Sequence, residues 1–266
     1  MPLVSSDAIV LHAFDYLESS RILRLVTRDA GVRSVLAKGL RKSARRYGGA
    51  VDLFSRGTAS FYTKPGRDLD TLASFDDARP AVALAADLAK FTGASMLAEL
   101  VLRFGRDAAD EGLYDAMADA LEQLARAPAH VVLTVALAAA WRLVGELGFA
   151  PVLEGCADCH TALGAGDPAL FSHPAGGVLC QRCAGLHTGR LLPPDARLAI
   201  IGWLANGAAA PAPAPVRLDE ASGRAHQRLL REFVREHLAD DRPLQAFAVW
   251  EHEPWSAAAP AIEPAG

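Results

Sequence analysis

Hydrophobic and polar residues alternate with a period of two over the first 80 residues, which predicts a run of short β-strands. Between two of these segments lies Asp29-Ala30-Gly31, which has the composition of a hairpin turn. The predicted strands cover residues 7–14, 21–28, 32–38, 50–63 (as one long or bulged strand) and 70–75. Such a series, with no helix of ordinary length between the strands, predicts a small closed β-barrel.

From Pro80 onward the apolar residues follow the 3.6-residue period of α-helices. The predicted helices cover residues 81–104, 107–126, 130–147, 193–204 and 222–238. They predict a helical bundle, interrupted by a loose Ala/Pro-rich loop that includes 208–215. The Pro/Ala/Glu-rich sequence beyond Arg242 predicts a largely disordered tail, most of all over 256–266.

The fold class predicted from these patterns is an α+β multidomain protein. Its predicted parts are a barrel domain (1–79), a helical domain (80–150 and 190–242), an inserted module (151–189) and a tail (243–266).

The inserted module contains all four cysteines of the chain, as two Cys-x2-Cys pairs. They are Cys156, Cys159, Cys180 and Cys183. Two such pairs on facing turns are typical of a tetrahedral zinc site with four thiolate ligands. A site closed by four thiolates has no open position for a water molecule, so the zinc ion is predicted to be structural.

Other uses of these cysteines remain open from the sequence. Disulfides need an oxidising compartment, which nothing in the sequence indicates. A redox-active Cys-x2-Cys usually occurs once, beside a βαβ pattern, and iron–sulfur ligands usually include three closely spaced cysteines. His160, His173 and His187 lie nearby and are interpreted as loop residues or as neighbours of the ligands.

The charge is distributed unevenly along the chain, although the net charge is only −4. Residues 1–80 contain 13 Lys and Arg against 9 Asp and Glu, a balance of +4, whereas the remaining residues contain 14 against 22, a balance of −8. No secretory signal is visible, and the apolar stretch 131–149 is interrupted by Arg142 and Glu146. These observations predict a cytoplasmic protein without a membrane span.

The sequence contains none of the common catalytic motifs. It has no phosphate-binding loop, no dinucleotide-binding glycine pattern, no nucleophile elbow and no His-Glu-x-x-His motif. The carboxylate pairs Asp76-Asp77 and Asp240-Asp241 are interpreted as solvated element ends. No reaction centre can be assembled from these residues, so the protein is predicted not to be an enzyme.

A basic segment between the predicted strands is the second informative feature. From Arg33 to Arg46 there are six basic residues and no acidic one: Arg33, Lys38, Arg41, Lys42, Arg45 and Arg46. Long cations without neighbouring acids suit phosphate neutralisation, and the aromatic rings of Tyr47, Phe61 and Tyr62 are candidates for stacking on unpaired bases. The alternative is a solvated charged loop, with the aromatic rings in the barrel core.

The order of these parts resembles the RecO family of bacterial recombination mediators. Three segments carry the resemblance: 7–31, 35–43 with Phe61-Tyr62, and Leu147-Gly148-Phe149-Ala150-Pro151 before the first cysteine pair. The resemblance implies an oligonucleotide-binding (OB) fold that binds single- and double-stranded DNA and anneals complementary strands. It also implies that RecR is a partner, that RecA is assisted indirectly, and that the helical domain receives the tail of the single-stranded-DNA-binding protein.

Two other functions remain open. The chain is alternatively a zinc-containing subunit of a nucleic-acid enzyme, or a protein–protein scaffold that uses the acidic helical domain.

Overall fold

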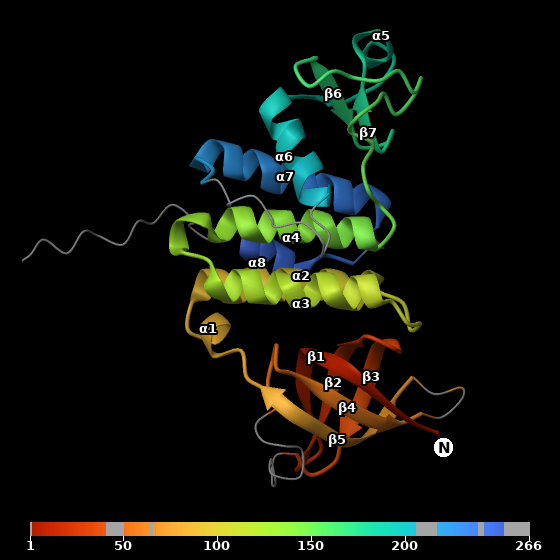
Figure 1. The fold of residues 1–266 in the computed structure, drawn as a ribbon, viewed down its shortest axis with the longest axis vertical. Helices are drawn as coiled ribbons and strands as arrows, with labels where there is room; N and C mark the ends of the chain where they lie inside the picture. Colours follow the sequence, from red (N-terminus) through yellow and green to blue (C-terminus); the bar gives the residue numbers. More distant parts are fainter. Residues whose placement is uncertain are drawn as a thin grey trace, which may run out of the picture.

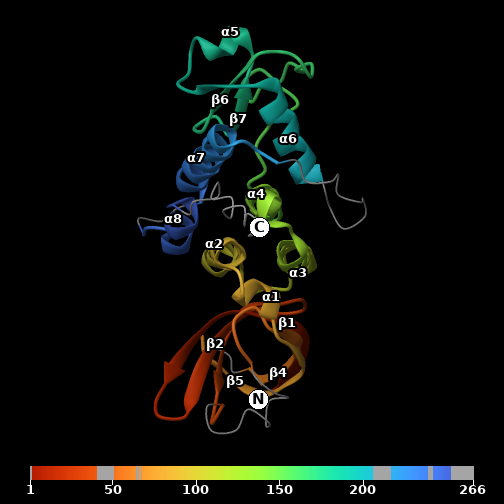
Figure 2. The same ribbon diagram turned by 90° about the vertical axis from the view of Figure 1, so that its left-hand side faces the viewer.

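The computed structural model describes residues 2–40, 51–63, 66, 68–205, 217–238 and 242–252. The molecule is elongated and has three parts stacked along its length (Figures 1 and 2). The barrel forms one end, helices form the middle, and a small sheet of residues 169–192 lies at the opposite end. The predicted fold class is therefore confirmed.

Five strands close into a barrel at the N-terminal end of the molecule. They are β1 (Leu3–Tyr16), β2 (Ser20–Thr27), β3 (Gly31–Ala37), β4 (Arg56–Tyr62) and β5 (Asp70–Arg79). Around the barrel their order is β1-β2-β3-β5-β4, and only the β3–β5 pair is parallel. The long strand β1 pairs with β4 through its first half and with β2 through its second half, which closes the ring.

The strand predicted over 50–63 is shorter in the structure, because residues 51–55 lie outside the ladder. Phe54 has a φ of 64° and places its ring against Phe91 in the helical domain, with the ring centroids 5.8 Å apart. Its side chain belongs to the helical core, so the chain turns out of the barrel here. Burial of the Phe54 ring explains why a β-like sequence does not continue the strand.

The middle of the molecule consists of helices. They are α1 (Val82–Ala85), α2 (Leu88–Phe104), α3 (Glu111–Arg126), the 3₁₀ turn η2 (Ala129–Val131), α4 (Val132–Glu146), α6 (Pro194–Ala205), α7 (Glu220–His237) and α8 (Gln245–His252). The helix predicted over 81–104 is divided into α1 and α2, and the helix predicted from 107 begins later, because Asp87 and Asp110 are N-caps. Their carboxylates accept the backbone N–H of Lys90 and Leu113 at 3.1 and 3.0 Å.

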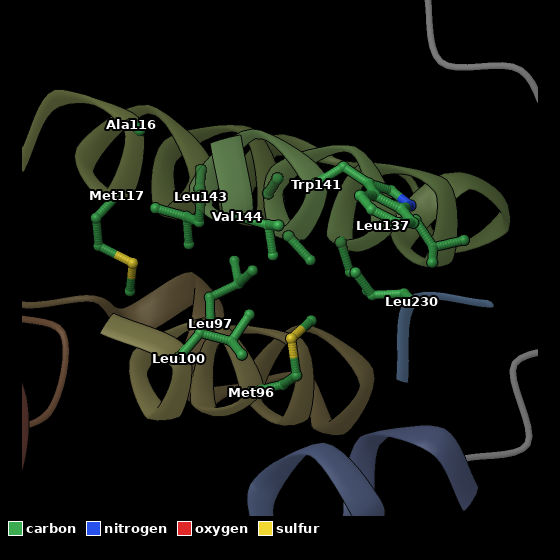
Figure 3. Packing of buried hydrophobic residues seen from close by; sticks show 14 of the residues in the cluster. Met96, Leu97, Leu100, Ala116, Met117, Leu137, Trp141, Leu143, Val144 and Leu230 are labelled. Atoms are coloured by element: carbon green, nitrogen blue, oxygen red, sulfur yellow. The ribbon is translucent and has the colours of Figure 1, made fainter. Parts of the chain in front are cut away.

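Helix α4 is the centre of the helical core. Figure 3 shows its side chains Trp141, Leu143 and Val144 above Leu97 and Leu100 of α2. The stretch Ala129–Glu146 is long and apolar enough to cross a membrane, but most of it is buried inside the protein. Its neighbours α2, α3, α6 and α7 supply the apolar surroundings, so its composition fits a core helix.

The tail predicted from residue 243 differs from the structure, because residues 245–252 form helix α8. Phe247 and Trp250 are 1 % and 0 % exposed, and their rings pack edge to face at 5.2 Å. Glu99 of α2 caps the helix, accepting the backbone N–H of Gln245 at 2.7 Å and of Phe247 at 2.9 Å. Helix α8 is therefore part of the helical domain, while 253–266 lie outside the described residues.

A buried histidine in the helical domain gives a pH-dependent stability. His226 of α7 packs edge to face on Trp203 of α6 at 5.0 Å, and burial lowers its pKa, against the opposing charge of Asp195. Because the folded pKa lies below the unfolded value of about 6.5, the unfolded state binds the proton more readily. We expect the melting temperature to fall as the pH drops from 7 towards 5.

Replacing His226 with phenylalanine keeps an aromatic ring against Trp203 and removes the titrating group. This variant should show a smaller loss of melting temperature between pH 7 and pH 5, measured by thermal denaturation at each pH. Substitution of the exposed His130 by glutamine is the matched control and should keep the wild-type difference. An unchanged pH dependence in the His226→Phe variant would show that other groups carry the effect.

Candidate metal centre and nucleic-acid interface

The inserted module is a three-stranded sheet with a cysteine pair at each of two turns. Its strands β6 (Ala169–Ser172), β7 (Gly177–Leu179) and β8 (Arg190–Leu192) lie in the order β7-β6-β8. The hairpin β6–β7 was predicted between the cysteine pairs, and Gly176 makes its turn at a φ of 72°. Strand β8 extends the module slightly beyond the predicted limit at residue 189.

Backbone hydrogen bonds shape both cysteine turns. In the first turn, Cys156 N–H donates to Thr161 O at 2.8 Å and His160 N–H donates to Cys156 O at 2.9 Å. In the second, Cys180 precedes the short helix α5 (Gln181–Ala184), whose Ala184 N–H donates to Cys180 O at 2.9 Å. Ala157 N–H donates to Val178 O at 2.8 Å, which ties the first turn to strand β7.

The four cysteine sulfurs form one compact cluster. All four Sγ atoms lie within 4.8 Å of one another, and those of Cys159 and Cys180 are 3.7 Å apart. A tetrahedral ion with Zn–S bonds of about 2.3 Å separates its sulfurs by roughly 3.8 Å. The thiols are free rather than paired in disulfides, so the cluster has the spacing and the donor atoms of a metal site.

The surroundings of the sulfurs favour thiolates on one side of the cluster. The hydroxyl and the backbone N–H of Thr161 hydrogen-bond to Cys159 and lower its pKa to about 5. Burial and the neighbouring Cys159 thiol raise the pKa of Cys183. Such opposed shifts arise when close sulfurs share protons, and a dication would favour the thiolate form of all four.

The charged side chains around the cluster are of both signs. Arg182 has its pKa raised by Cys159, and Asp158 has its pKa lowered by hydrogen bonds to Cys183 and His187. A dication held by four thiolates would have a net charge of −2, which the guanidinium of Arg182 would partly offset. His187 lies 3.3 Å from Asp158 and outside the sulfur cluster.

The module is anchored to the helical domain by buried contacts. Phe171 of β6 packs on Phe233 of α7, with centroids 5.9 Å apart. Arg197 of α6 is almost fully buried and donates to the carbonyl oxygens of Gly164 and Ala165. His237 Nε2 lies 2.7 Å from His173 O. A metal that fixes the module therefore also fixes the surface against which α6 and α7 pack.

The structure describes only some of the basic and aromatic residues that were predicted to bind DNA. Arg41, Lys42, Arg45, Arg46 and Tyr47 lie outside the described residues. Lys38 is exposed directly after β3, and Tyr62 is 41 % exposed at the end of β4.

Two of the predicted site residues have other places in the structure. Phe61 is 0 % exposed within the barrel core, so its ring is not available for stacking on a base. Arg33 Nη2 donates to Asp107 O of the helical domain at 2.9 Å, while its Nε donates to Ala30 O in the β2–β3 turn of the barrel at 2.9 Å. These contacts make Arg33 a residue of the junction between the domains.

Several other basic side chains of the barrel also contact the helical domain at this junction. Arg28 donates to both carboxylate oxygens of Asp115, at 2.5 and 3.0 Å, and lies over the Tyr114 ring at 4.7 Å. Arg24 donates to Leu102 O at 3.0 Å, and Arg56 lies 3.8 Å from Glu122. One end of the barrel therefore uses its positive charge to hold the acidic helices.

Two connections that are rich in basic residues begin at the other end of the barrel, one after β3 and one after β4. Thr71 near the start of β5 pairs with Leu36 of β3 on one side and with Tyr62 of β4 on the other. The ends of β3 and β4 therefore flank the start of β5. The connections that begin there contain Arg41, Lys42, Arg45, Arg46, Lys64 and Arg67 in the sequence. We call this the distal end of the barrel, defined by Lys38, Tyr62 and Thr71.

One group of aromatic residues on the barrel surface was not among the predicted site residues. His12, Phe14 and Tyr16 occupy alternate positions of β1, and all three side chains are exposed. The rings of His12 and Phe14 are 5.7 Å apart. The alternation of these rings with Ala13 and Asp15 was visible in the sequence, because a strand presents every second residue on one face.

Comparison with known proteins matches both halves of this architecture. A family model described as "Recombination protein O N terminal" matches residues 1–80, and one described as "Recombination protein O C terminal" matches residues 85–245. The protein named DNA repair protein RecO from Rubrobacter xylanophilus is 31 % identical over 246 residues, covering 91 % of this chain and 94 % of its own length. Its namesake from Anaeromyxobacter dehalogenans is 34 % identical over 241 residues, covering 90 % and 92 %.

Proposed function

Since the chain belongs to the RecO family of DNA repair proteins, we propose that it is a recombination mediator that binds single- and double-stranded DNA at the distal end of its barrel. It anneals complementary strands and, with RecR, assists the loading of RecA onto single strands coated with the single-stranded-DNA-binding protein. The protein is not an enzyme and acts in the cytoplasm.

The observation that supports this proposal is the division of positive charge between the two ends of the barrel. Arg24, Arg28, Arg33 and Arg56 contact the helical domain. The cations of the two distal connections are left as the candidates for phosphate contacts. The connections that contain these cations begin at neighbouring strand ends of a closed barrel, which suits the OB-fold mode of binding nucleic acid.

Annealing by this route requires electrostatics rather than a reaction centre. Two DNA strands repel each other through their phosphates, and cations bound along both strands reduce that repulsion. Complementary bases on the two strands can then approach and pair. No nucleophile, general base or catalytic metal is needed for this step.

The cysteine cluster is proposed to bind one structural zinc ion. Cys156, Cys159, Cys180 and Cys183 are the ligands, and the ion stabilises the module and its contacts with α6 and α7. The acidic helical domain is proposed to receive the tail of the single-stranded-DNA-binding protein, which would bring the barrel to DNA coated by that protein.

The test of the DNA-binding proposal is a fourfold alanine substitution at Arg41, Lys42, Arg45 and Arg46. Loss of four phosphate contacts should lower the slope of log K against log salt by about 3 on single strands and should slow annealing strongly. Fluorescence anisotropy over a salt series measures the slope, and pairing of labelled strands measures annealing.

A matched control removes the same charge elsewhere. Alanine at Arg217, Arg224, Arg228 and Arg235, all exposed, lowers the net charge equally on and before helix α7. This control should keep the wild-type slope. Equal losses in both variants would indicate a general charge effect, and unchanged binding in the distal variant would overturn the assignment. Nuclease, ligase or ATPase activity of the purified protein would favour the enzyme alternative.

A further inference from the structure

Strand β1 carries a row of exposed rings on the outside of the barrel. In the register of the strands, His12 pairs with Arg24 and Phe14 pairs with Ile22. Next along the row, Tyr16 pairs with Ser20. Phe14 and Tyr16 are 43 % and 41 % exposed, so part of each ring is open to solvent. We call the residues His12, Phe14 and Tyr16 the ring ladder.

The opposite face of the same strands explains why the ladder is exposed. Ala13 of β1 pairs with Leu23 of β2, and Leu23 is 0 % exposed in the barrel core. Because successive side chains of a strand point to opposite faces, the residues on either side of Ala13 must point outward. The rings therefore do not complete the core of the barrel, and their apolar surface needs another explanation.

The ladder leads towards the basic distal end. Arg21, the residue after Ser20, pairs with Ala37 at the end of β3, and the exposed Lys38 follows directly. The Tyr16 end of the ladder is therefore near Lys38, within the acid-free stretch 33–46. The acidic Asp15 points to the other face, where its carboxylate accepts the Nε–H of Arg21 at 3.1 Å.

We propose that the ring ladder stacks on the unpaired bases of a single-stranded nucleic acid whose phosphates are held at the distal end. This inference rests on the proposed DNA-binding function and adds the surface that binds the bases. Backbone positions two residues apart on a strand are separated by about 7 Å, and the rings of His12 and Phe14 are 5.7 Å apart. Both spacings exceed the roughly 3.4 Å rise of stacked bases, so the ladder takes bases that have been spread apart.

Charge and rigidity favour bases over an apolar protein segment as the occupant. Each ring is carried by a residue of β1 whose backbone is paired with β2, so little conformational freedom is lost on stacking. The exposed Lys38 lies near the end of the row, where a phosphate group can be held, and every base offers a π-face irrespective of sequence. The ladder would thereby hold a strand with its pairing edges accessible.

The experiment compares a thymidine oligonucleotide with an abasic oligonucleotide of the same length and charge. The wild-type full-length protein should bind the thymidine strand more tightly, since only that strand can stack. Changing Phe14 or Tyr16 to alanine should weaken thymidine binding by about fivefold or more for each ring. Binding to the abasic strand and the salt slope should stay at wild-type values, because the phosphate contacts remain.

Controls separate stacking from other effects. The conservative changes Phe14→Tyr and Tyr16→Phe keep the rings and should keep the preference, whereas Phe149→Ala removes a similarly exposed ring from outside the barrel. A Phe14→Trp variant provides a direct signal, because its added fluorescence should be quenched by the thymidine strand and not by the abasic one.

The outcomes distinguish the ladder from the function on which it rests. Equal wild-type affinity for both oligonucleotides, with a steep salt dependence, would overturn the ladder and leave DNA binding intact. A preference that survives in the Phe14→Ala/Tyr16→Ala double variant would also overturn it. The absence of wild-type binding to either strand at low salt would overturn both proposals.

Discussion

Replacing Cys156 or Cys180 with serine should remove the metal and lower the melting temperature by about 10 °C. The reason is that the ion is expected to stabilise the folded module by on the order of 4 kcal/mol, as a ligand present at about a thousand times its dissociation constant does. Near this chain length such a loss corresponds to about 8–16 °C. Elemental analysis measures the metal content, and thermal denaturation measures the stability.

The effect should be confined to the half of the molecule that holds the module. Phe171 and Arg197 connect the module to α7 and α6, whereas the barrel lies beyond α2 and α3. DNA affinity at a temperature where the variant is folded should therefore stay close to that of the wild type. His187→Ala is the control, because the imidazole lies near the cluster without belonging to it. A serine variant that retains one equivalent of zinc, or a metal-free protein of full stability, would contradict the structural role.

Replacing Trp250 with alanine should destabilise the protein by about 3–5 kcal/mol. The indole is 0 % exposed against the Phe247 ring, and its removal leaves a cavity between α8 and the rest of the helical core. The loss of stability should appear in the denaturant midpoint, measured by far-ultraviolet circular dichroism during urea unfolding.

The neighbouring residue on the same helix supplies a close control. Val249 is 56 % exposed, so Val249→Ala should change stability by no more than about 0.5 kcal/mol. If both variants unfold at the wild-type midpoint, helix α8 does not form part of the folded domain. A fully disordered segment after residue 242 would then be the better description.

Local patterns made the barrel and the metal module predictable from the sequence. The period-two alternation and the Asp29-Ala30-Gly31 turn specify neighbouring strands, and the spacing of the cysteines specifies a site through short-range geometry. Helix α8 was missed because its evidence is not local. Its eight residues are fixed by Glu99 at the N-terminus and by contacts with α2, which are distant in the sequence.

The candidate DNA site was also only partly predictable from local sequence patterns. Phe61 and Tyr62 are adjacent on β4 and must point to opposite faces, so only one of the two could reach a ligand on the barrel surface. Which one remains exposed depends on the side of the strand that faces the core, and the structure places Phe61 there. Arg33 was assigned to DNA from its charge alone, because the sequence does not reveal that Asp107 lies beside it.

The junction between the barrel and the helices has a mechanical consequence. The Phe54 ring is inserted among helical side chains, Val32 N–H donates to Arg106 O at 2.9 Å, and the guanidinium of Arg28 is held by Asp115. Because both apolar and ionic contacts hold this junction, a displacement of the helices is transmitted to the barrel. A partner bound to the helices would therefore move together with the barrel. The length of the protein itself would set the distance between this partner and DNA bound at the distal end.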